Sequence, residues 1–332
     1  WRNRRHRENR VALALSALHL FQRDRDYLLR DGQIQIIDPG TGRVAEGRAW
    51  SQGLHQCIEL KEGCAQTQGQ IPGAQITFQQ LFRRYLWCCG ASGSLWEARG
   101  ELAEIYDLQV VRIAPHRSSR RRHLGNRLYP DQAAQWLDVL SKTRDLHTVG
   151  QPVLIGVDSV ADSESLAALL RAAGLPVQTL NARQDRQEAR LIALAGQRGQ
   201  ITVSTNIAGR GADIPLGAGV EALGGLHVIS CQHNADRRID RQLAGRCARQ
   251  GQAGSLECLL SLDSGLSQRQ LPAGLRRLLA GRLEHPLAQA LGRLLLRRAQ
   301  RREQRQARAA RRQLLQQQQQ LARLLAFAGP LD

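Results

Sequence analysis

The chain has 332 residues, which is enough for two domains or for one large domain with a sizeable core. Its formal net charge is +18, almost all of it from arginine, and this charge indicates an anionic partner: nucleic acid, anionic lipid headgroups or an acidic protein surface. No apolar run reaches the ~18–20 residues that span a bilayer, and the seven cysteines have no C-x-x-C spacing, which excludes a transmembrane helix, a disulfide framework and a zinc site.

The first 75 residues predict a small α/β module. Residues 1–20 read as a basic helix, and residues 27–38 read as a hairpin because Asp31-Gly32 is a strong two-residue turn between two apolar runs. A helix around residues 53–63 closes the module. Because the chain begins at Trp1 and contains no methionine, we expect it to be part of a longer polypeptide.

The middle of the chain predicts an α/β domain with a parallel sheet. Residues 76–95 form an aromatic-rich strand or helix, and the charge run at 117–122 reads as a linker. From about residue 151, strands and helices alternate, which favours a parallel sheet covered on both faces. We expect strands at 153–157, 177–180, 201–204, 225–230 and 256–262, and helices at 159–173, 185–195 and 235–249.

The last part of the chain predicts a long helix. Residues 286–327 contain neither glycine, apart from Gly292, nor a proline after Pro286, and they are rich in leucine, alanine, arginine and glutamine. At 1.5 Å per residue such a helix is on the order of 60 Å long.

A glycine-rich loop follows the apolar strand expected at 201–204. It contains Gly209, Arg210 and Gly211, whose backbone N–H groups could approach a nucleotide closely because glycine adds no side-chain bulk. Asp213 at its end could accept a hydrogen bond from a ribose hydroxyl or orient a neighbouring arginine.

Two arginines follow in the helix expected at 235–249. Arg246 and Arg249 lie three residues apart, so on a helix they would project from one face. Two guanidiniums presented together suit the negative charge on a transferring γ-phosphoryl group. An arginine finger in this position raises the rate of phosphoryl transfer about 10³–10⁵-fold. The alternative is a surface helix with solvated arginines. The order of loop, apolar strand and arginine pair favours the nucleotide interpretation.

Several segments resemble the SecA family, in the order in which that family has them. They are Asp26-Tyr27 with Asp31-Gly32, Trp50-Ser51-Gln52-Gly53-Leu54-His55-Gln56, Ile76-Thr77-Phe78-Gln79, Gly90-Ala91-Ser92-Gly93-Ser94 and Glu284-His285-Pro286, together with the two stretches just described. The resemblance implies the end of a preprotein cross-linking domain at 1–75, the end of a first motor domain at 76–120, a second RecA-like motor domain of the helicase C-terminal type at 121–265 and a helical scaffold at 266–332.

The resemblance also implies site residues. Nucleotide contacts fall on Gly209, Arg210, Gly211, Asp213, Gln242 and Gln250, the catalytic arginines are Arg246 and Arg249, and a coupling loop comprises Ser92, Gly93 and Ser94. The sequence departs from the family at Ala212, Ala244 and Ala248, which stand beside these residues. No G-x-x-x-x-G-K-[ST] phosphate loop occurs in the chain. We therefore expect the phosphate loop, the catalytic base and the magnesium ligands outside it, and no ATP hydrolysis by this chain alone.

The functional hypothesis is part of a SecA-like ATPase that drives proteins through the Sec channel. It implies ATP with Mg²⁺ as the cofactor and no zinc. The implied partners are preproteins, the Sec channel and an anionic phospholipid surface, with self-association of the chain as a further possibility. It implies a cytoplasmic protein at the inner face of the cell membrane. Two alternatives stay open: a superfamily-two nucleic-acid helicase or remodeller, which the +18 charge favours, and a non-catalytic SecA-like remnant.

Overall fold

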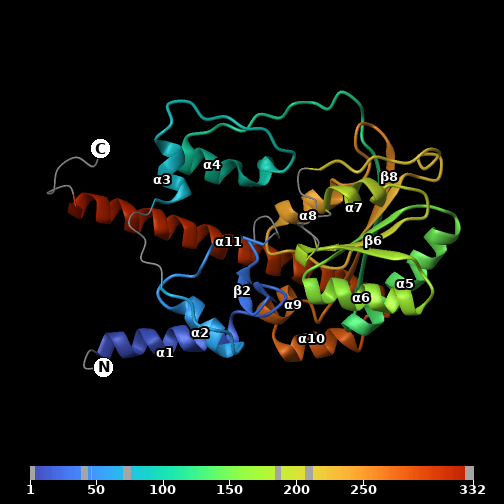
Figure 1. Ribbon diagram of the computed structural model, residues 1–332. Helices are drawn as coiled ribbons and strands as arrows, with labels where there is room; N and C mark the ends of the chain where they lie inside the picture. The colour runs from blue at the N-terminus through green and yellow to red at the C-terminus, as the bar shows by residue number, and fades with distance from the viewer. Residues whose placement is uncertain are drawn as a thin grey trace.

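The computed structural model describes residues 4–38, 44–45, 47–69, 76–183, 188–205 and 212–325. Within them, six parallel strands form one sheet in the order β3-β8-β7-β4-β6-β5 (Figure 1). The strands are β3 (Arg120–Tyr129), β4 (Val153–Val157), β5 (Val177–Leu180), β6 (Ile201–Thr205), β7 (Leu226–Ser230) and β8 (Ala253–Ser261). The predicted α/β class with a parallel sheet is confirmed.

Helices cover both faces of this sheet, as predicted. On one face α5 (Gln132–Thr148) and α6 (Val160–Ala172) pack against β4, β6 and β7 in a cluster that includes Val139 and Leu166. On the other face α7 (Glu188–Ala195) and α8 (Arg237–Ala244) contribute Ile192 and Leu243 to a second cluster. The central strands β4, β6 and β7 are buried along their whole length because helices cover both of their faces.

Local signals explain the ends of α6. The Ser159 side chain accepts a hydrogen bond from the backbone N–H of Asp162 at 2.9 Å, which makes it the N-cap of the helix. At the other end Gly174 has φ +81°, a conformation in which a side chain is strained. Both signals are in the sequence, and both predictions are confirmed.

The charge run at 117–122 is not only a linker, which corrects the prediction. Residues from Arg120 onward belong to β3, the edge strand that pairs with β8 from Arg120↔Ala253 to Tyr129↔Ser261. This strand was not predicted because it has no apolar run: only one of its side chains, Leu128, is fully buried. Its arginines lie on an edge strand in contact with solvent, where charged side chains are tolerated.

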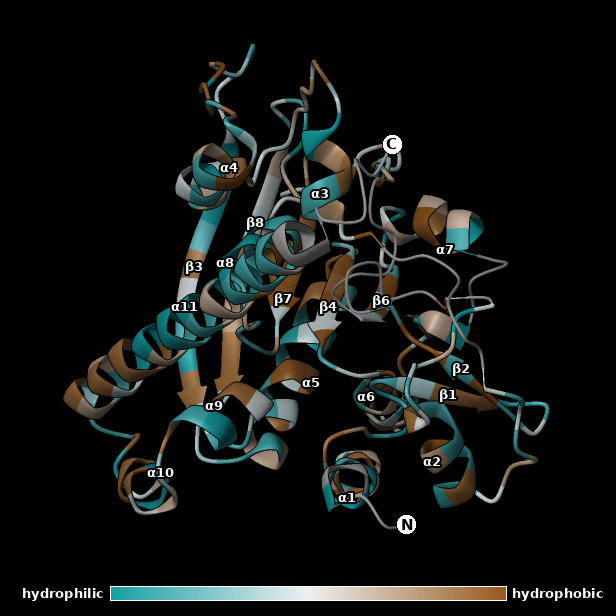
Figure 2. Ribbon diagram, turned by 90° about the vertical axis from the view of Figure 1, so that its left-hand side faces the viewer, coloured by the Kyte–Doolittle hydropathy of each residue, from teal (hydrophilic) through white to brown (hydrophobic). Residues whose placement is uncertain are grey.

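The predicted long helix is α11 (Pro286–Leu325), preceded by α9 (Gly265–Gln270) and α10 (Ala273–Ala280). Leu296 of α11 packs with Leu128 of β3 and Leu279 of α10 in a third cluster. The first turns of α11 are hydrophobic and its middle is hydrophilic (Figure 2). The helix is therefore fixed to the sheet at one end and runs outward from it.

The amino-terminal module is built as predicted. Helices α1 (Arg4–His19) and α2 (Leu54–Lys61) pack with a hairpin of β1 (Tyr27–Arg30) and β2 (Gln33–Ile36), whose two-residue turn has positive φ at Asp31 and Gly32. The hairpin also contacts the sheet domain, because its Leu28 packs against Val160 at the start of α6.

Residues 76–115 lie apart from the sheet, above α11 in Figure 1. The aromatic-rich segment predicted at 76–95 is helical only in α3 (Phe78–Arg83), and Leu86 and Trp87 behind it are almost fully exposed. A short 3-10 helix η1 (Leu95–Ala98) and α4 (Arg99–Tyr106) follow. Both Thr77, the N-cap of α3, and α4 contact α11.

Candidate nucleotide site

The two predicted catalytic arginines lie in the turn after α8, not on the helix expected at 235–249. The helix ends at Ala244, and φ is positive at Ala248, Gln250 and Gly251. A helix cannot continue through these conformations. The turn leads the chain back into β8, and it packs so closely on that strand that a Cβ at Gly254 would lie 2.6 Å from the Ala248 nitrogen.

Both guanidiniums nevertheless meet at one point. Nη1 of Arg249 donates to the carbonyl oxygen of Ala212 at 3.0 Å, and Nη1 of Arg246 reaches the same oxygen at 3.4 Å. Arg246 is buried, whereas about a third of the Arg249 side chain is exposed. The turn therefore brings the two charges together although they are not on a helical face.

Asp213 holds Arg249 in this position. Its Oδ1 accepts from Arg249 Nη1 at 2.8 Å and its Oδ2 accepts from Gln250 Nε2 at 3.1 Å. Arg249 also donates from Nε to the carbonyl oxygen of Gly245 at 2.9 Å. Of the two roles considered for Asp213, the contacts favour orientation of an arginine. Gly209, Arg210 and Gly211 lie outside the described residues.

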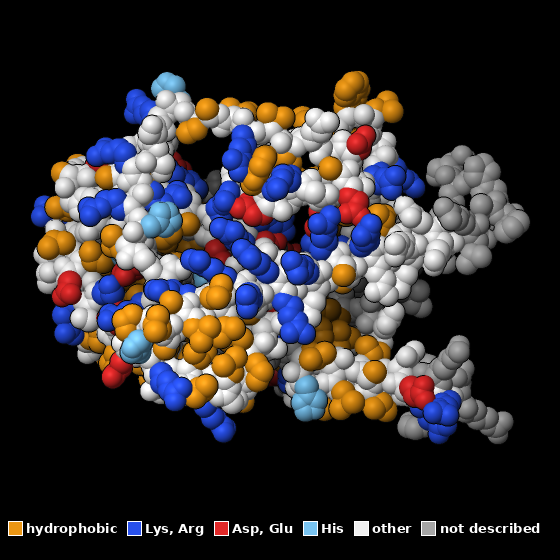
Figure 3. All heavy atoms as spheres, turned by 180° about the vertical axis from the view of Figure 1, so that it is seen from behind, with side chains coloured by type: hydrophobic (Ala, Val, Ile, Leu, Met, Phe, Trp, Pro, Cys, Tyr) orange, Lys and Arg blue, Asp and Glu red, His pale blue; other side chains and the backbone are white. Residues whose placement is uncertain are grey.

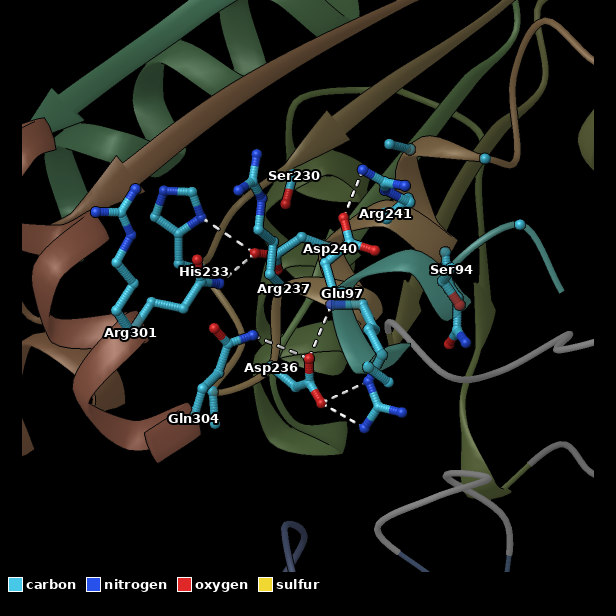
Figure 4. Close-up of a pocket in the computed structure, with 18 of the residues that line it drawn as sticks. Ser94, Glu97, Ser230, His233, Asp236, Arg237, Asp240, Arg241, Arg301 and Gln304 are labelled. Atoms are coloured by element: carbon cyan, nitrogen blue, oxygen red, sulfur yellow. Dashed lines mark hydrogen bonds and ion pairs between the residues drawn. The ribbon is translucent and has the colours of Figure 1, made fainter. Parts of the chain in front are cut away.

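A cavity of about 1810 Å³ lies beside the arginine pair. The coupling loop Ser92, Gly93 and Ser94 lines it together with Gln242, Arg246 and Arg249. In Figure 4, side chains from the 92–98 segment, from α8 and from α11 point into this space. The structure thus brings together six of the predicted site residues, while Asp213 and Gln250 lie behind Arg249 and do not line the cavity.

The loop predicted to be a coupling loop is followed by η1, which forms an ion pair with α8. The hydroxyl oxygens of Ser92 and Ser94 lie 3.2 Å apart, and Ser94 is buried. Next to the loop, Glu97 of η1 forms an ion pair with Arg241 of α8 at 2.5 Å. Glu97 therefore connects the segment behind the loop to α8.

The long helix contacts the start of α8 through residues that the sequence reasoning missed. Gln300 Nε2 donates to the Asn234 carbonyl oxygen at 2.8 Å and to Asp240 Oδ2 at 2.5 Å, and Gln304 Nε2 donates to Asp236 Oδ1 at 3.1 Å. Two features of the sequence could have indicated these contacts. Gln300 and Gln304 are four residues apart and therefore share a helix face, and Asp236 is a typical N-cap residue.

Asp236 is stabilised as a carboxylate. Burial by itself would raise its pKa, but hydrogen bonds from the Arg238 side chain and backbone, together with the Gln304 amide, lower the pKa below the usual range. The negative charge stands at the amino end of α8, where the helix dipole also favours it. This carboxylate therefore remains charged at neutral pH and keeps its contact with α11.

The same helix is tied to α4 by ion pairs. Arg311 forms a bidentate pair with Glu101, with nitrogen–oxygen distances of 2.5 and 2.8 Å, and Arg308 and Arg312 both reach Glu104. Helix α11 therefore links the 92–106 segment to α8 and the sheet. Within the described ranges no group of three or more His, Cys, Asp or Glu side chains is arranged to hold a metal ion.

Two family models match the chain. One, described as the SecA P-loop domain, matches residues 118–223 and 218–280, and one, described as the SecA preprotein cross-linking domain, matches residues 2–59. The chain belongs to the SecA family. This confirms the resemblance that the hairpin and the stretches around Asp213 and Arg246 indicated.

SecA relatives match over most of the chain. Protein translocase subunit SecA 3 of Magnetococcus marinus is 47% identical over 335 residues, covering 100% of this chain and 51% of that protein. Protein translocase subunit SecA 2 of Nitrosospira multiformis is 43% identical over 330 residues, covering 99% of this chain and 50% of that protein. The chain spans about half the length of these SecA relatives.

Solved structures of helicases are similar to part of this SecA family chain. The Escherichia coli DEAD-box protein SrmB, bound to regulator of ribonuclease activity A, is 20% identical with a TM-score of 0.37, covering 44% of this chain and 81% of that chain. Mss116p domain 2 bound to an RNA duplex is 16% identical with a TM-score of 0.36, covering 46% and 58%. At these identities the likeness concerns the fold alone. Among the described residues, no helix is both long enough and apolar enough to cross a membrane.

Proposed function

We propose that this chain is the part of a SecA-type, ATP-driven protein translocation motor that supplies the arginines to an ATP site completed by another domain. The observation that carries the proposal is the meeting of the Arg246 and Arg249 guanidiniums at one carbonyl oxygen beside the cavity. Guanidiniums present planar forks of N–H donors that match phosphate oxygens. In this proposal the domain boundaries expected at residues 75, 120 and 265 separate the parts of the motor.

The residues present fit one side of such a site. Arg246 and Arg249 would hold the terminal phosphate, and Ser92 and Ser94 line the same cavity. ATP with Mg²⁺, when bound, supplies the phosphoryl group whose transfer drives the motor. No carboxylate cluster for Mg²⁺ is present among the described residues, so the metal ligands would come from another domain.

The chain's own contacts suggest how the site acts on the rest of the motor. Arg249 can exchange its ion pair with Asp213 for a phosphate oxygen, because this pair is partly exposed. A movement of the turn would shift α8, and α8 is joined to the coupling segment by Arg241–Glu97 and to α11 by Asp240–Gln300. Arginine binding to phosphate would thus be converted into a displacement of the long helix.

The partners belong to the same proposal. The relatives are protein translocase subunits by name, and we extend this to preproteins and the Sec channel as partners of the motor that contains this chain. The net charge of +18 supports attraction to an anionic phospholipid surface on the cytoplasmic side of the membrane.

A chimera tests the arginine role. This chain replaces the matching half of Magnetococcus marinus SecA 3, to which it is 47% identical over its whole length, and ATP hydrolysis is measured in steady state. Arg249→Ala in the chimera should lower kcat by about 10³ or more, and Arg246→Ala should act in the same direction. The exposed Arg282, outside the cavity, provides the matched control Arg282→Ala.

Two outcomes would contradict the proposal. If kcat were unchanged in both arginine variants of an active chimera, Arg246 and Arg249 would have no role in ATP hydrolysis. ATP turnover above background by residues 1–332 alone would show that the site needs no other domain.

A further inference from the structure

Arg121 of the edge strand β3 is attached to the turn after α8. Its Nη2 donates a hydrogen bond to the carbonyl oxygen of Cys247 at 3.0 Å. Cys247 lies in the chain between Arg246 and Arg249, the two arginines of the proposed site. A side chain from a distant part of the sequence therefore holds the backbone of this turn between the two arginines.

The pairing of β3 with β8 explains how Arg121 reaches the turn. Arg121 is the partner of Gly254 in this parallel pair, so a side chain at 254 would stand on the same face of the sheet beside it. A Cβ at Gly254 would lie 2.6 Å from the Ala248 nitrogen and 3.0 Å from the Cys247 Cβ. The turn thus packs on bare backbone of β8, and Arg121 holds it from the neighbouring strand.

A second residue close to Arg121 in the chain also meets the turn. Gly251 has a φ of +79°, and a Cβ there would lie 3.0 Å from the Cβ and the Cδ of Arg117. Residues 117–121, which we call the connection, join residues 76–115 to the sheet. The connection therefore lies against the turn at both Cys247 and Gly251.

Arg121 differs from the arginines of the protein surface. Lys and Arg side chains gather across the middle of the face seen in Figure 3, and Arg122, the next residue of β3, is exposed. Arg121 is only partly exposed, and its Nε is buried without a hydrogen-bond partner in the described part of the chain. Because a buried donor without a partner costs stability, the place of this side chain calls for another explanation, and its contact with the turn supplies one.

We propose that Arg121 is a positioning residue for the proposed ATP site. By holding the Cys247 carbonyl oxygen, it keeps the turn against β8. The turn fixes the point at which the Arg246 and Arg249 guanidiniums meet, so a displacement of the connection is transmitted to both. This inference rests on the proposed function, because it takes the arginine pair as the phosphate-binding group. The attachment of the turn to Arg121 can be tested without ATP.

The first test measures local opening of the turn in the whole 332-residue chain. Cys247 is 1% exposed, so its thiol reacts with iodoacetamide only when the turn opens, and mass spectrometry follows the alkylation of each cysteine separately. Arg121→Gln should raise the alkylation rate of Cys247 about tenfold or more, because a hydrogen bond from a charged group is lost. The matched control, Arg122→Gln, removes the same charge from an exposed neighbour and should change the rate by less than about twofold.

The direction of the change separates opening of the turn from an electrostatic effect. Burial raises the pKa of the Cys247 thiol, and the guanidinium of Arg121 beside it acts in the opposite direction. Loss of the charge alone would leave less thiolate, which is the nucleophile, and would slow the alkylation. Cys231 is buried in the same domain and reports on unfolding of the whole domain. No rise at Cys247, or an equal rise at Cys231, would overturn the proposal.

The second test measures ATP hydrolysis in the SecA 3 chimera. Arg121→Gln should lower kcat about tenfold or more, because the arginines are misplaced, and should change KM by less than about twofold. Arg121→Lys, which keeps a donor for the Cys247 carbonyl oxygen, should recover part of kcat. An unchanged kcat for Arg121→Gln in a chimera that Arg249→Ala impairs would overturn the positioning role. If Arg249→Ala leaves kcat unchanged, the proposed function fails instead, and the alkylation of Cys247 alone decides whether Arg121 holds the turn.

Discussion

Arg249 and Asp213 form an ion pair of 2.8 Å that joins the turn after α8 to the segment before β7. The pair is partly exposed, with 34% of the Arg249 side chain and 49% of the Asp213 side chain accessible. Asp213→Asn should therefore reduce the free energy of unfolding by less than about 1 kcal/mol, measured by urea denaturation. In the SecA 3 chimera it should lower kcat more than it changes KM, because it releases the arginine that we place at the phosphate.

A comparable pair elsewhere provides the control. Arg120 and Glu221 are also 2.8 Å apart, Glu221 is as exposed as Asp213 while Arg120 is more exposed than Arg249, and both lie outside the cavity. Glu221→Gln should match Asp213→Asn in stability and leave kcat unchanged. Equal kcat values for the two variants would show that the Asp213 contact is only structural.

The sheet and the long helix could be predicted because their signals are local. Apolar runs such as residues 153–157, the N-cap Ser159 and the stop at Gly174 each act within one element. The edge strand β3 could not be predicted in this way, because its arginines lie on a sheet edge and its one fully buried residue, Leu128, depends on contacts with α10 and α11.

The geometry of the two arginines proposed for the site differs from the prediction. Arg246 and Arg249 were expected on a helix face, and they meet instead through a turn with positive φ at Ala248. A single sequence gives little warning of this, because alanine favours a helix and the turn is imposed by the packing of β8 at Gly254. Gln300 was missed for the same reason, since its partners at 234 and 240 lie far from it in the chain.

Gln300 should prove essential to the contact between α11 and α8. It is buried, and its amide satisfies the Asn234 carbonyl oxygen and the Asp240 carboxylate. Gln300→Leu leaves both acceptors without this donor, which should cost about 1–3 kcal/mol in urea denaturation. Gln313→Leu, at an exposed position of the same helix, should cost less than about 0.5 kcal/mol. Equal costs would contradict the role assigned to Gln300.

The contact between α4 and α11 should weaken in acid. The hydrogen bonds from Arg311 lower the pKa of Glu101, against the effect of burial. Because the folded pKa is lowered, the pair contributes its full stability above the pKa of a glutamate in an unfolded chain, about 4.3, and loses it as the pH falls through the folded value. Relative to wild type, Glu101→Gln should be destabilised near neutral pH, and this difference should shrink toward about pH 3.

Glu8, which is exposed and forms an ion pair with Arg4, supplies the control for this pH series. Glu8→Gln should leave the pH dependence of unfolding nearly as it is in the wild type. A difference between wild type and Glu101→Gln that grows on acidification would contradict the assigned direction of the pKa shift.

Gly225 should be irreplaceable at the start of β7, because two constraints act on it at once. Its φ is +73°, and a Cβ there would lie 1.9 Å from the carbonyl oxygen of Ala253, a backbone atom of β8 that cannot move without the strand. Gly219 has a φ of +74° in the same loop, with open space around it. Gly219→Ala should therefore cost only the backbone strain, about 1 kcal/mol. Gly225→Ala should cost several times as much or prevent folding, because it must also separate β7 from β8. Urea denaturation of both variants measures the difference, and equal stabilities would mean that the close approach to Ala253 does not constrain the sheet.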